Sequence, residues 1–216
     1  MQIKKYLVLG VLFLLPLSMY IFFASGKDNF GRLPVLTKNI VEIDKFTSPD
    51  SDTVRLDNSI TILGFFGNDP LENKVNAYNL AHKIYKKYRG FHDFQIVILQ
   101  PEGSEEASIT LKENLSEIAN TDRWKFVYGT SEEIKEVFNS LQSEYLLMPD
   151  NSSPYVFIVD KNRELRGRND DEDVGMLYGY DARDFAEINN KMDDDVKVIL
   201  AEYRLELKKY KADREI

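Results

Sequence analysis

The fold of this chain is decided by the stretch ITILGFFGNDPLEN, residues 60–73. It overlaps an apolar run, residues 59–66, that is rich in β-branched and aromatic residues and predicts a buried strand. Pro70 suits the first turn of a helix, and the apolar residues that follow keep helical spacing. A turn between a strand and a helix is a common place for chemistry. This turn offers Asp69 and Asn73, and neither is an obvious nucleophile.

Strand and helix patterns alternate through the rest of the chain. Thr130 and Glu133 form a capping-box pattern, which predicts the start of a helix. The alternation predicts an α/β domain with a mixed central sheet. The predicted strands are residues 40–43, 94–99, 124–128 and 155–159, with edge strands at 165–168 and 176–180, and the predicted helices are residues 109–119, 130–141 and 185–210.

The composition excludes several classes of function. The chain has 216 residues, a formal net charge of -8 and no basic stripe, so no nucleic-acid partner is expected. It contains no cysteine, which rules out disulfides, thiol redox catalysis and thiolate metal sites. The two histidines, His82 and His92, stand apart from any third candidate ligand and are expected to be solvated. No cofactor is therefore predicted.

The N-terminal residues predict a membrane anchor. Residues 6–23 form an uncharged run of 18, within the range of roughly 17–25 residues that spans a bilayer as a helix. Lys4 and Lys5 precede the run and are expected to stay in the cytoplasm, which puts the following domain in the periplasm. A cleaved signal peptide is the alternative, although its apolar core is usually about 7–15 residues. We expect a single-pass signal anchor in the cytoplasmic (inner) membrane at residues 1–24, a tether at 25–52 and a folded domain at 53–216.

From residue 53 onward, three motifs in order resemble the thioredoxin fold, and more narrowly its membrane-anchored Sco-type and TlpA-like branch. Residues 60–67 are similar to the strand that leads to the family's active-site turn. The turn DPLEN, residues 69–73, stands where that branch has Cys-Pro-x-x-Cys. The segment SPYVFIVD, residues 153–160, is similar to a late strand whose proline, here Pro154, is cis and faces the active site. The resemblance implies a mixed sheet flanked by helices behind a transmembrane helix.

The same resemblance identifies what is missing. The family's two turn cysteines exchange disulfides or bind copper, and they align here with Asp69 and Asn73. A carboxylate and an amide hold no sulfur for exchange, and their hard oxygens suit Cu(I) poorly. The family's copper histidine lies near residues 151–153, which are NSS here. Arg163 also replaces the usual glycine of the hairpin at residues 160–166. The turn is interpreted as a former active site whose scaffold survives.

Two interpretations apply to the turn and to the late strand. Asp69 either binds a cation or caps the helix that follows, and capping is favoured because Pro70 and Glu72 complete a helix start. The proline of the late strand either shapes a peptide-binding groove or serves architecture alone. The groove that remains for binding is predicted from Phe66, Asn68, Ser153, Pro154 and Tyr155.

Three functions follow from these residues. The first is a non-catalytic binding or assembly factor, for which the resemblance implies a protein partner in the envelope and a role in respiratory or metalloprotein assembly. The second is an enzyme, or a protein that binds a hard metal ion, through Asp69 and Asn73 or through the acidic loop at residues 170–173. The third is a passive tethered scaffold. The first is favoured because the fold signature is kept while every active-site sulfur is lost.

Overall fold

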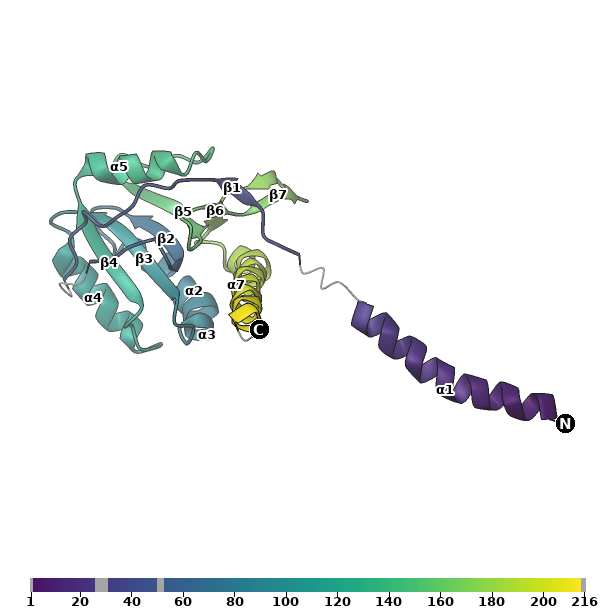
Figure 1. Ribbon diagram of the computed structural model, residues 1–216. Coiled ribbons are helices and arrows are strands. Elements are labelled where there is room, and N and C mark those ends of the chain that lie inside the picture. The colour runs from purple at the N-terminus through teal and green to yellow at the C-terminus, as the bar shows by residue number, and fades with distance from the viewer. Residues whose placement is uncertain (1, 26–30, 50–52, 215–216) are drawn as a thin grey trace. The chain divides into compact units, whose positions relative to one another are not determined.

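The computed structural model describes residues 2–25, 31–49 and 53–214, and it divides the chain into two units, Met1–Gly31 and Arg32–Ile216 (Figure 1). The first unit contains one helix, α1, Gln2–Ser25, with Pro16 inside it. Within the described part of the chain, no helix meets the length and apolarity needed to cross a membrane. The anchor at residues 1–24 therefore stays a prediction.

The second unit is built on a seven-stranded mixed sheet. Its strands run in the order β1-β6-β5-β2-β3-β4, and β9 pairs with β5 outside that path. β2, β3 and β4 are parallel to one another, and the other pairs are antiparallel. The strands are β1 Val35–Thr37, β2 Ile60–Phe66, β3 Phe94–Pro101, β4 Trp124–Gly129, β5 Ser152–Val159, β6 Leu165–Arg166 and β9 Tyr180–Asp181, and a separate hairpin joins β7 Arg168–Asp171 to β8 Gly175–Leu177.

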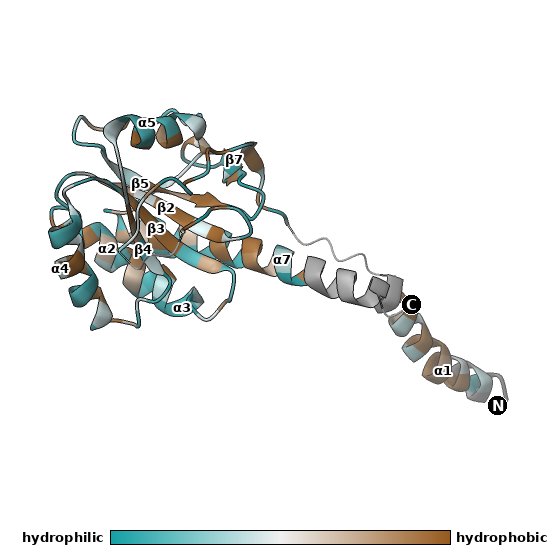
Figure 2. Cartoon of the chain, turned by 60° about the vertical axis from the view of Figure 1, so that its left-hand side comes forward, coloured by the Kyte–Doolittle hydropathy of each residue, from teal (hydrophilic) through white to brown (hydrophobic). Residues whose placement is uncertain are grey.

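Alternation along β2 divides its side chains between two cores. Ile62 and Phe66 belong to one core, Leu63 and Phe65 belong to the other, and all four are fully buried. A strand that is covered on both faces accounts for the uninterrupted apolar run in the sequence. Figure 2 shows the apolar strands β2 and β3 between helices whose outer surfaces are largely hydrophilic.

Helices cover both faces of the sheet (Figure 1). α5, Ser131–Ser140, covers one face and starts with the predicted capping box of Thr130 and Glu133. Two continuous helical runs each contain a π-helical segment, η1 or η2. The elements on the second face are α2 Lys74–Leu80, η1 Ala81–Tyr85, α3 Lys86–Tyr88, α4 Glu105–Ser116, α6 Phe185–Glu187, η2 Ile188–Met192 and α7 Asp193–Arg214.

Most of the segment expected to be a tether packs into the domain. β1 pairs with β6, and Ile40 and Ile43 are fully buried in the core beneath α5. Thr47 and Tyr128 of β4 exchange two backbone hydrogen bonds of 2.9 Å. The structure therefore places residues 32–49 in the folded unit, whereas residues 26–30 and 50–52 of the predicted tether lie outside the described residues.

The strand expected at residues 40–43 is not formed, because this segment bonds to a loop and to the end of α5 instead of to a neighbouring strand. The Ile40 N–H donates to the Arg163 carbonyl at 2.9 Å, and the Val41 N–H donates to Ser140 Oγ at 3.1 Å. The buried isoleucines gave the sequence pattern of a strand, while the strand itself lies earlier, at Val35–Thr37.

Candidate functional site

The chain turns sharply at Gly67, between β2 and α2. Its φ of +70° is in the region that favours glycine. A Cβ at this position would lie 2.8 Å from Asp150 Oδ2 and 2.9 Å from Ser152 Cβ. The turn after β2 therefore lies directly against the loop that precedes β5, as the resemblance implied, and glycine is needed for this close approach.

Asp69 supports a tight turn that precedes the helix. Its Oδ1 accepts a hydrogen bond of 2.9 Å from the Leu71 N–H. Successive backbone bonds, from Glu72 to Asp69 and from Lys74 to Leu71, span three residues each. The helix expected to begin at Pro70 therefore begins at Lys74. Asp69 accepts a backbone N–H, as the capping interpretation expects, but the element that it caps is this turn.

Asn73 ties the turn to the end of β2. Its Nδ2 donates to the Phe66 carbonyl at 3.0 Å, and its Oδ1 accepts from Nδ2 of the buried Asn76 at 3.1 Å. Both ends of the amide are thus used to hold backbone and helix together. The residue that aligns with a reactive cysteine of the family has an architectural role here.

The loop before β5 carries an amide where the family has a copper histidine. Asn151 is 3 % exposed and has a φ of +65°. Its Nδ2 donates to Ser131 Oγ at 2.9 Å. Among the described residues no group of three potential metal ligands is found.

The cis proline implied by the resemblance is wrong for this chain. The described residues contain no cis peptide bond, so the bond between Ser153 and Pro154 is trans. Pro154 lies in β5 opposite a register shift between Leu63 and Phe65 of β2. A ladder irregularity accommodates a residue that has no N–H to donate. On the other side, the Pro154 carbonyl accepts the Ala182 N–H at 2.9 Å.

The five residues predicted to line a groove do not share one exposed surface. Phe66 and Ser153 are buried, Pro154 and Tyr155 are half-buried, and Asn68 is exposed. Phe66 and Ser153 therefore cannot contact a partner directly. Asn68, the residue before the capped turn, is the exposed member of the set.

Tyr155 belongs to an aromatic cluster that the sequence did not single out. Its ring stacks on Tyr145 with centroids 3.8 Å apart, and Tyr178 meets Tyr145 edge-on at 6.4 Å. Burial raises the pKa of Tyr145 to about 12, so its hydroxyl stays protonated near neutral pH. Leu146 and Met148, in the same irregular segment, are 79 % and 53 % exposed. This segment has no regular spacing, so no periodic signal could have identified it.

Met148 connects the aromatic cluster to the turn. Its N–H donates to the Ser152 carbonyl at 2.8 Å, and Ser152 pairs with Phe66 at the end of β2. We call Asn68, Leu146, Met148 and Tyr155 the turn-side surface. Leu146 and Met148 expose apolar side chains, and Asn68 is the exposed residue that follows Gly67 in the turn.

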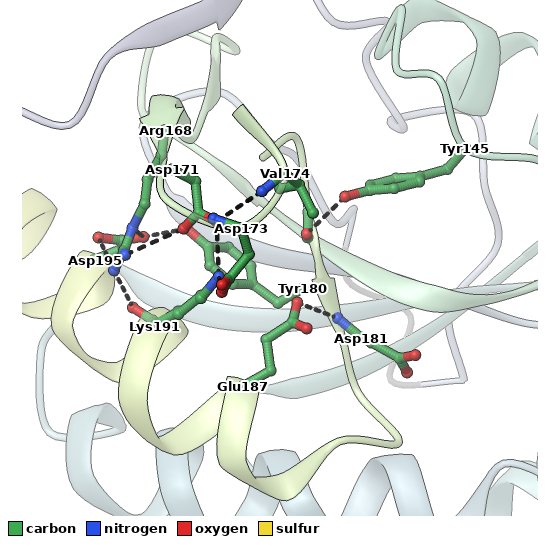
Figure 3. A network of polar contacts seen from close by, with 11 residues as sticks. Tyr145, Arg168, Asp171, Asp173, Val174, Tyr180, Asp181, Glu187, Lys191 and Asp195 are labelled. Atoms are coloured by element: carbon green, nitrogen blue, oxygen red, sulfur yellow. Dashed lines mark hydrogen bonds and ion pairs between the residues drawn. The ribbon is translucent and has the colours of Figure 1, made fainter. Parts of the chain in front are cut away.

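An ionic network fastens the β7–β8 hairpin to the C-terminal helical run (Figure 3). Arg168 contacts Asp195 at 2.7 Å, and Lys191 contacts Asp171 at 2.7 Å. The Tyr180 hydroxyl donates to Asp195 at 2.6 Å. These contacts join residues far apart in the sequence and hold the hairpin in place.

The acidic loop at residues 170–173 supplies two members of this network. Asp171 has a side chain only 2 % exposed, and Asp173 contacts the same Lys191 ammonium at 2.6 Å. Burial alone would raise the pKa of Asp171, but hydrogen bonds from Lys191 and from the Asp173 and Val174 amides lower it. The buried carboxylate of the loop, Asp171, is therefore paired with Lys191. Among the described acids of the loop, no buried carboxylate is left free to bind a metal ion, as the metal-binding alternative would need.

We predict that Lys191→Met lowers the free energy of unfolding at pH 7 by about 1.5–3 kcal/mol, the usual contribution of a charged hydrogen bond. Because the folded-state pKa of Asp171 is lowered, its stabilising contribution is present above the unfolded value, near 4, and is lost as the pH falls through the folded value. The difference between wild type and variant should shrink between pH 7 and about pH 2 in urea titrations.

The matched control is Lys135→Met, on α5, where no ion pair involves this exposed lysine in the described part of the chain. It should change stability at neither pH. A Lys191→Met deficit that is equal at both pH values would contradict a role for the Asp171 pair.

The topology β3-β2-β5-β6, followed by a C-terminal helix, is that of a thioredoxin-like fold. A proposed electron transport protein from Aquifex aeolicus VF5 has a similar structure, with a TM-score of 0.50 and 14 % identity over 77 % of this chain and 96 % of its own. This similarity supports the fold alone.

Two further solved structures have lower TM-scores. A proposed thiol:disulfide interchange protein DsbE from Chlorobium tepidum has a TM-score of 0.49 and 10 % identity, over 78 % of this chain and 99 % of its own. Copper-bound ScoI from Arabidopsis thaliana has a TM-score of 0.42 and 17 % identity, over 70 % of this chain and 94 % of its own. No protein family and no curated protein matches this chain in sequence.

Proposed function

We propose that this chain is a membrane-tethered, extracytoplasmic thioredoxin-like protein that binds another protein without catalysing a reaction. The observation that carries the proposal is the structural role of Asp69 and Asn73, whose side chains bond to the backbone of the turn and of β2. Asp69 holds the turn through the Leu71 N–H, and Asn73 holds the end of β2. With no cysteine in the chain, the turn keeps its architecture and has no group for thiol exchange.

The membrane tethering in this proposal is argued from the predicted anchor, the uncharged run at residues 6–23 that follows Lys4 and Lys5. It places the folded unit outside the cytoplasmic membrane, within reach of other envelope proteins. The Sco-type resemblance favours a partner that takes part in respiratory or metalloprotein assembly.

The turn-side surface is the binding face that we assign to this function. Leu146 and Met148 expose large apolar side chains, and Tyr145, which precedes Leu146 in the chain, stacks on Tyr155. Aromatic and methionine side chains are enriched at the cores of protein interfaces. Asn68 adds an exposed polar group beside the turn.

Crosslinking of the full-length chain in membranes, followed by mass spectrometry, tests the proposal. We expect terminal-oxidase or cytochrome-assembly subunits to be enriched over a control that contains residues 1–31 only. The double variant Leu146→Asp, Met148→Asp should reduce their capture about tenfold or more, because truncation of a hot-spot side chain at the centre of an interface costs about 2 kcal/mol or more.

Ile109→Asp is the matched control, since Ile109 is 52 % exposed on α4, outside the turn-side surface. It should leave capture unchanged. Equal capture by wild type and the double variant would exclude this face, and enrichment of no protein over the anchor control would favour a passive tethered scaffold.

A further inference from the structure

A basic hollow lies between the first and the last helical runs of the folded unit. Its volume is about 320 Å³. η1 and α3 supply the basic side chains, and η2 and α7 supply an amide and a carboxylate. The lining residues are His82, Lys83, Lys86, Lys87, Asn189 and Asp193.

The single carboxylate of the hollow is already neutralised. Asp193 accepts hydrogen bonds from Lys87 Nζ at 2.7 and 2.8 Å and from the Tyr88 hydroxyl at 2.7 Å. Lys197 approaches it at 2.8 Å. Burial alone would raise the pKa of Asp193, but these hydrogen bonds lower it, so the group stays ionised and fully partnered.

Two lysines of the hollow keep their charge uncompensated. Lys83 Nζ lies 4.4 Å from the centre of the Phe185 ring, which holds the ammonium at the rim without neutralising it. Lys86 is exposed, and no carboxylate within the described ranges forms an ion pair with it. Like charges three residues apart on one helical run repel each other unless an anion lies between them. This local excess of positive charge is notable in a chain whose net charge is -8.

The backbone supports the same conclusion. Both helical runs change to a π-helix where they line the hollow, at η1 and at η2. Interruptions of this kind are frequent at functional sites, because they alter which side chains share a face of the helix. Here η1 contributes His82 and Lys83, and η2 contributes Asn189.

We propose that this hollow binds a phosphate-type anion. Lysine ammonium groups bind phosphate as point charges, and Lys83 and Lys86 supply two of them. The Asn189 amide and the His82 ring add polar groups from both sides. The same chemistry fits a free phosphorylated small molecule and a phospholipid headgroup, so the experiment must separate these sources.

The test uses the full chain in neutral detergent micelles, titrated by NMR with inorganic phosphate and, separately, with short-chain phosphatidylglycerol. We expect saturable shifts of residues 82–87 and 189–193 with at least one probe. Saturation by phosphate indicates a soluble ligand, and saturation by the lipid alone indicates a headgroup. Lys86→Gln should weaken binding about fivefold, as expected for one ammonium near an anion in water, and Lys83→Gln with Lys86→Gln should weaken it further.

Lys135→Gln removes the same charge from the exposed surface of α5 and should leave binding unchanged. The substituted lysines of the hollow are not buried, so the variants should fold, which thermal unfolding verifies. Absence of saturation with both probes would overturn the proposal. Equal weakening by Lys135→Gln and Lys86→Gln would also overturn it, since it would show a general charge effect.

Discussion

Replacement of Arg166 by methionine is expected to lower the free energy of unfolding by about 3–5 kcal/mol, the usual cost of removing one partner of a buried ion pair. Arg166 Nη1 contacts Asp160 Oδ2 at 2.8 Å, and Nη2 contacts Glu202 Oε2 at 2.6 Å. The side chain of Asp160 is fully buried and that of Arg166 is 5 % exposed. Methionine would fill much of the volume but would leave a buried carboxylate without its cation.

Arg166 also joins three parts of the domain that lie far apart in the sequence. Its Nε and Nη2 donate to the Leu33 carbonyl at 2.8 and 2.6 Å, which fixes the segment before β1. Asp160 accepts the N–H groups of Asn162 and Glu164, both at 2.9 Å, and so shapes the β5–β6 hairpin. The single substitution therefore removes contacts to the segment before β1, to the β5–β6 hairpin and to α7.

The measurement is a urea titration of the full chain in neutral detergent, followed by the fluorescence of Trp124, the single tryptophan. Lys38→Met is the control, because Lys38 is 70 % exposed and contacts Glu164 at 3.4 Å. Such a surface pair contributes about 0–1 kcal/mol. The double variant Arg166→Met, Asp160→Asn should lose less free energy of unfolding than the sum of the losses in the two single variants. A loss below about 1 kcal/mol for Arg166→Met would contradict the role of the network.

The strands at the centre of the fold could be predicted because burial on both faces leaves a local signal. The runs at residues 59–66, 94–99 and 155–159 coincide, to within one residue, with parts of the central strands β2, β3 and β5. The capping box at Thr130 was equally clear, since both of its hydrogen bonds are made within four residues. These signals indicated an α/β domain, and the resemblance of the motifs at residues 60–67, 69–73 and 153–160 indicated the thioredoxin-like fold.

The features that were missed depend on contacts between distant residues. Residues 32–49 look like a linker in sequence, because their binding partners lie in the β5–β6 hairpin and on β4. α2 starts at Lys74, after a turn that the Asn73 side chain ties to the Phe66 carbonyl at the end of β2. The trans bond at Pro154 accompanies a register shift in the β2–β5 pairing. Such pairing cannot be read from local spacing.

The packing of the turn against the loop before β5 could be predicted, and the exposed side chains of the turn-side surface could not. The turn at residues 67–73 does lie against the loop before β5, as the resemblance implied. Leu146 and Met148 belong to an irregular segment that contacts β5 through the Tyr145–Tyr155 stack. An aromatic stack between an irregular segment and a strand has no sequence period.

That stack depends on the core, and Phe157→Ala is expected to show the dependence. Phe157 is fully buried, and its ring packs edge-on against Phe65 at 6.1 Å and against Phe138 at 6.0 Å. Truncation of a buried phenylalanine to alanine usually costs about 3–5 kcal/mol, through lost transfer energy and the cavity that remains. The same ring also lies 6.1 Å from Tyr145, so the cavity would open beside the ring that stacks on Tyr155.

Two readouts separate the effects of this substitution. Urea titration followed by Trp124 fluorescence should show the full loss of stability for Phe157→Ala. Phe157→Leu should retain most of the wild-type stability, because the leucine fills part of the volume. Phe185→Ala is the control: Phe185 is 49 % exposed, and its truncation should cost about 1 kcal/mol or less.

The second readout is the capture of partners by crosslinking at a temperature where Phe157→Ala remains folded. Because Phe157 supports Tyr145 from below and Tyr145 supports Tyr155, capture should fall even in the folded variant. Phe185→Ala should not affect it. Normal capture by a folded but destabilised Phe157→Ala variant would show that partner binding does not require the aromatic base, and it would restrict the binding face to the exposed Leu146 and Met148 side chains.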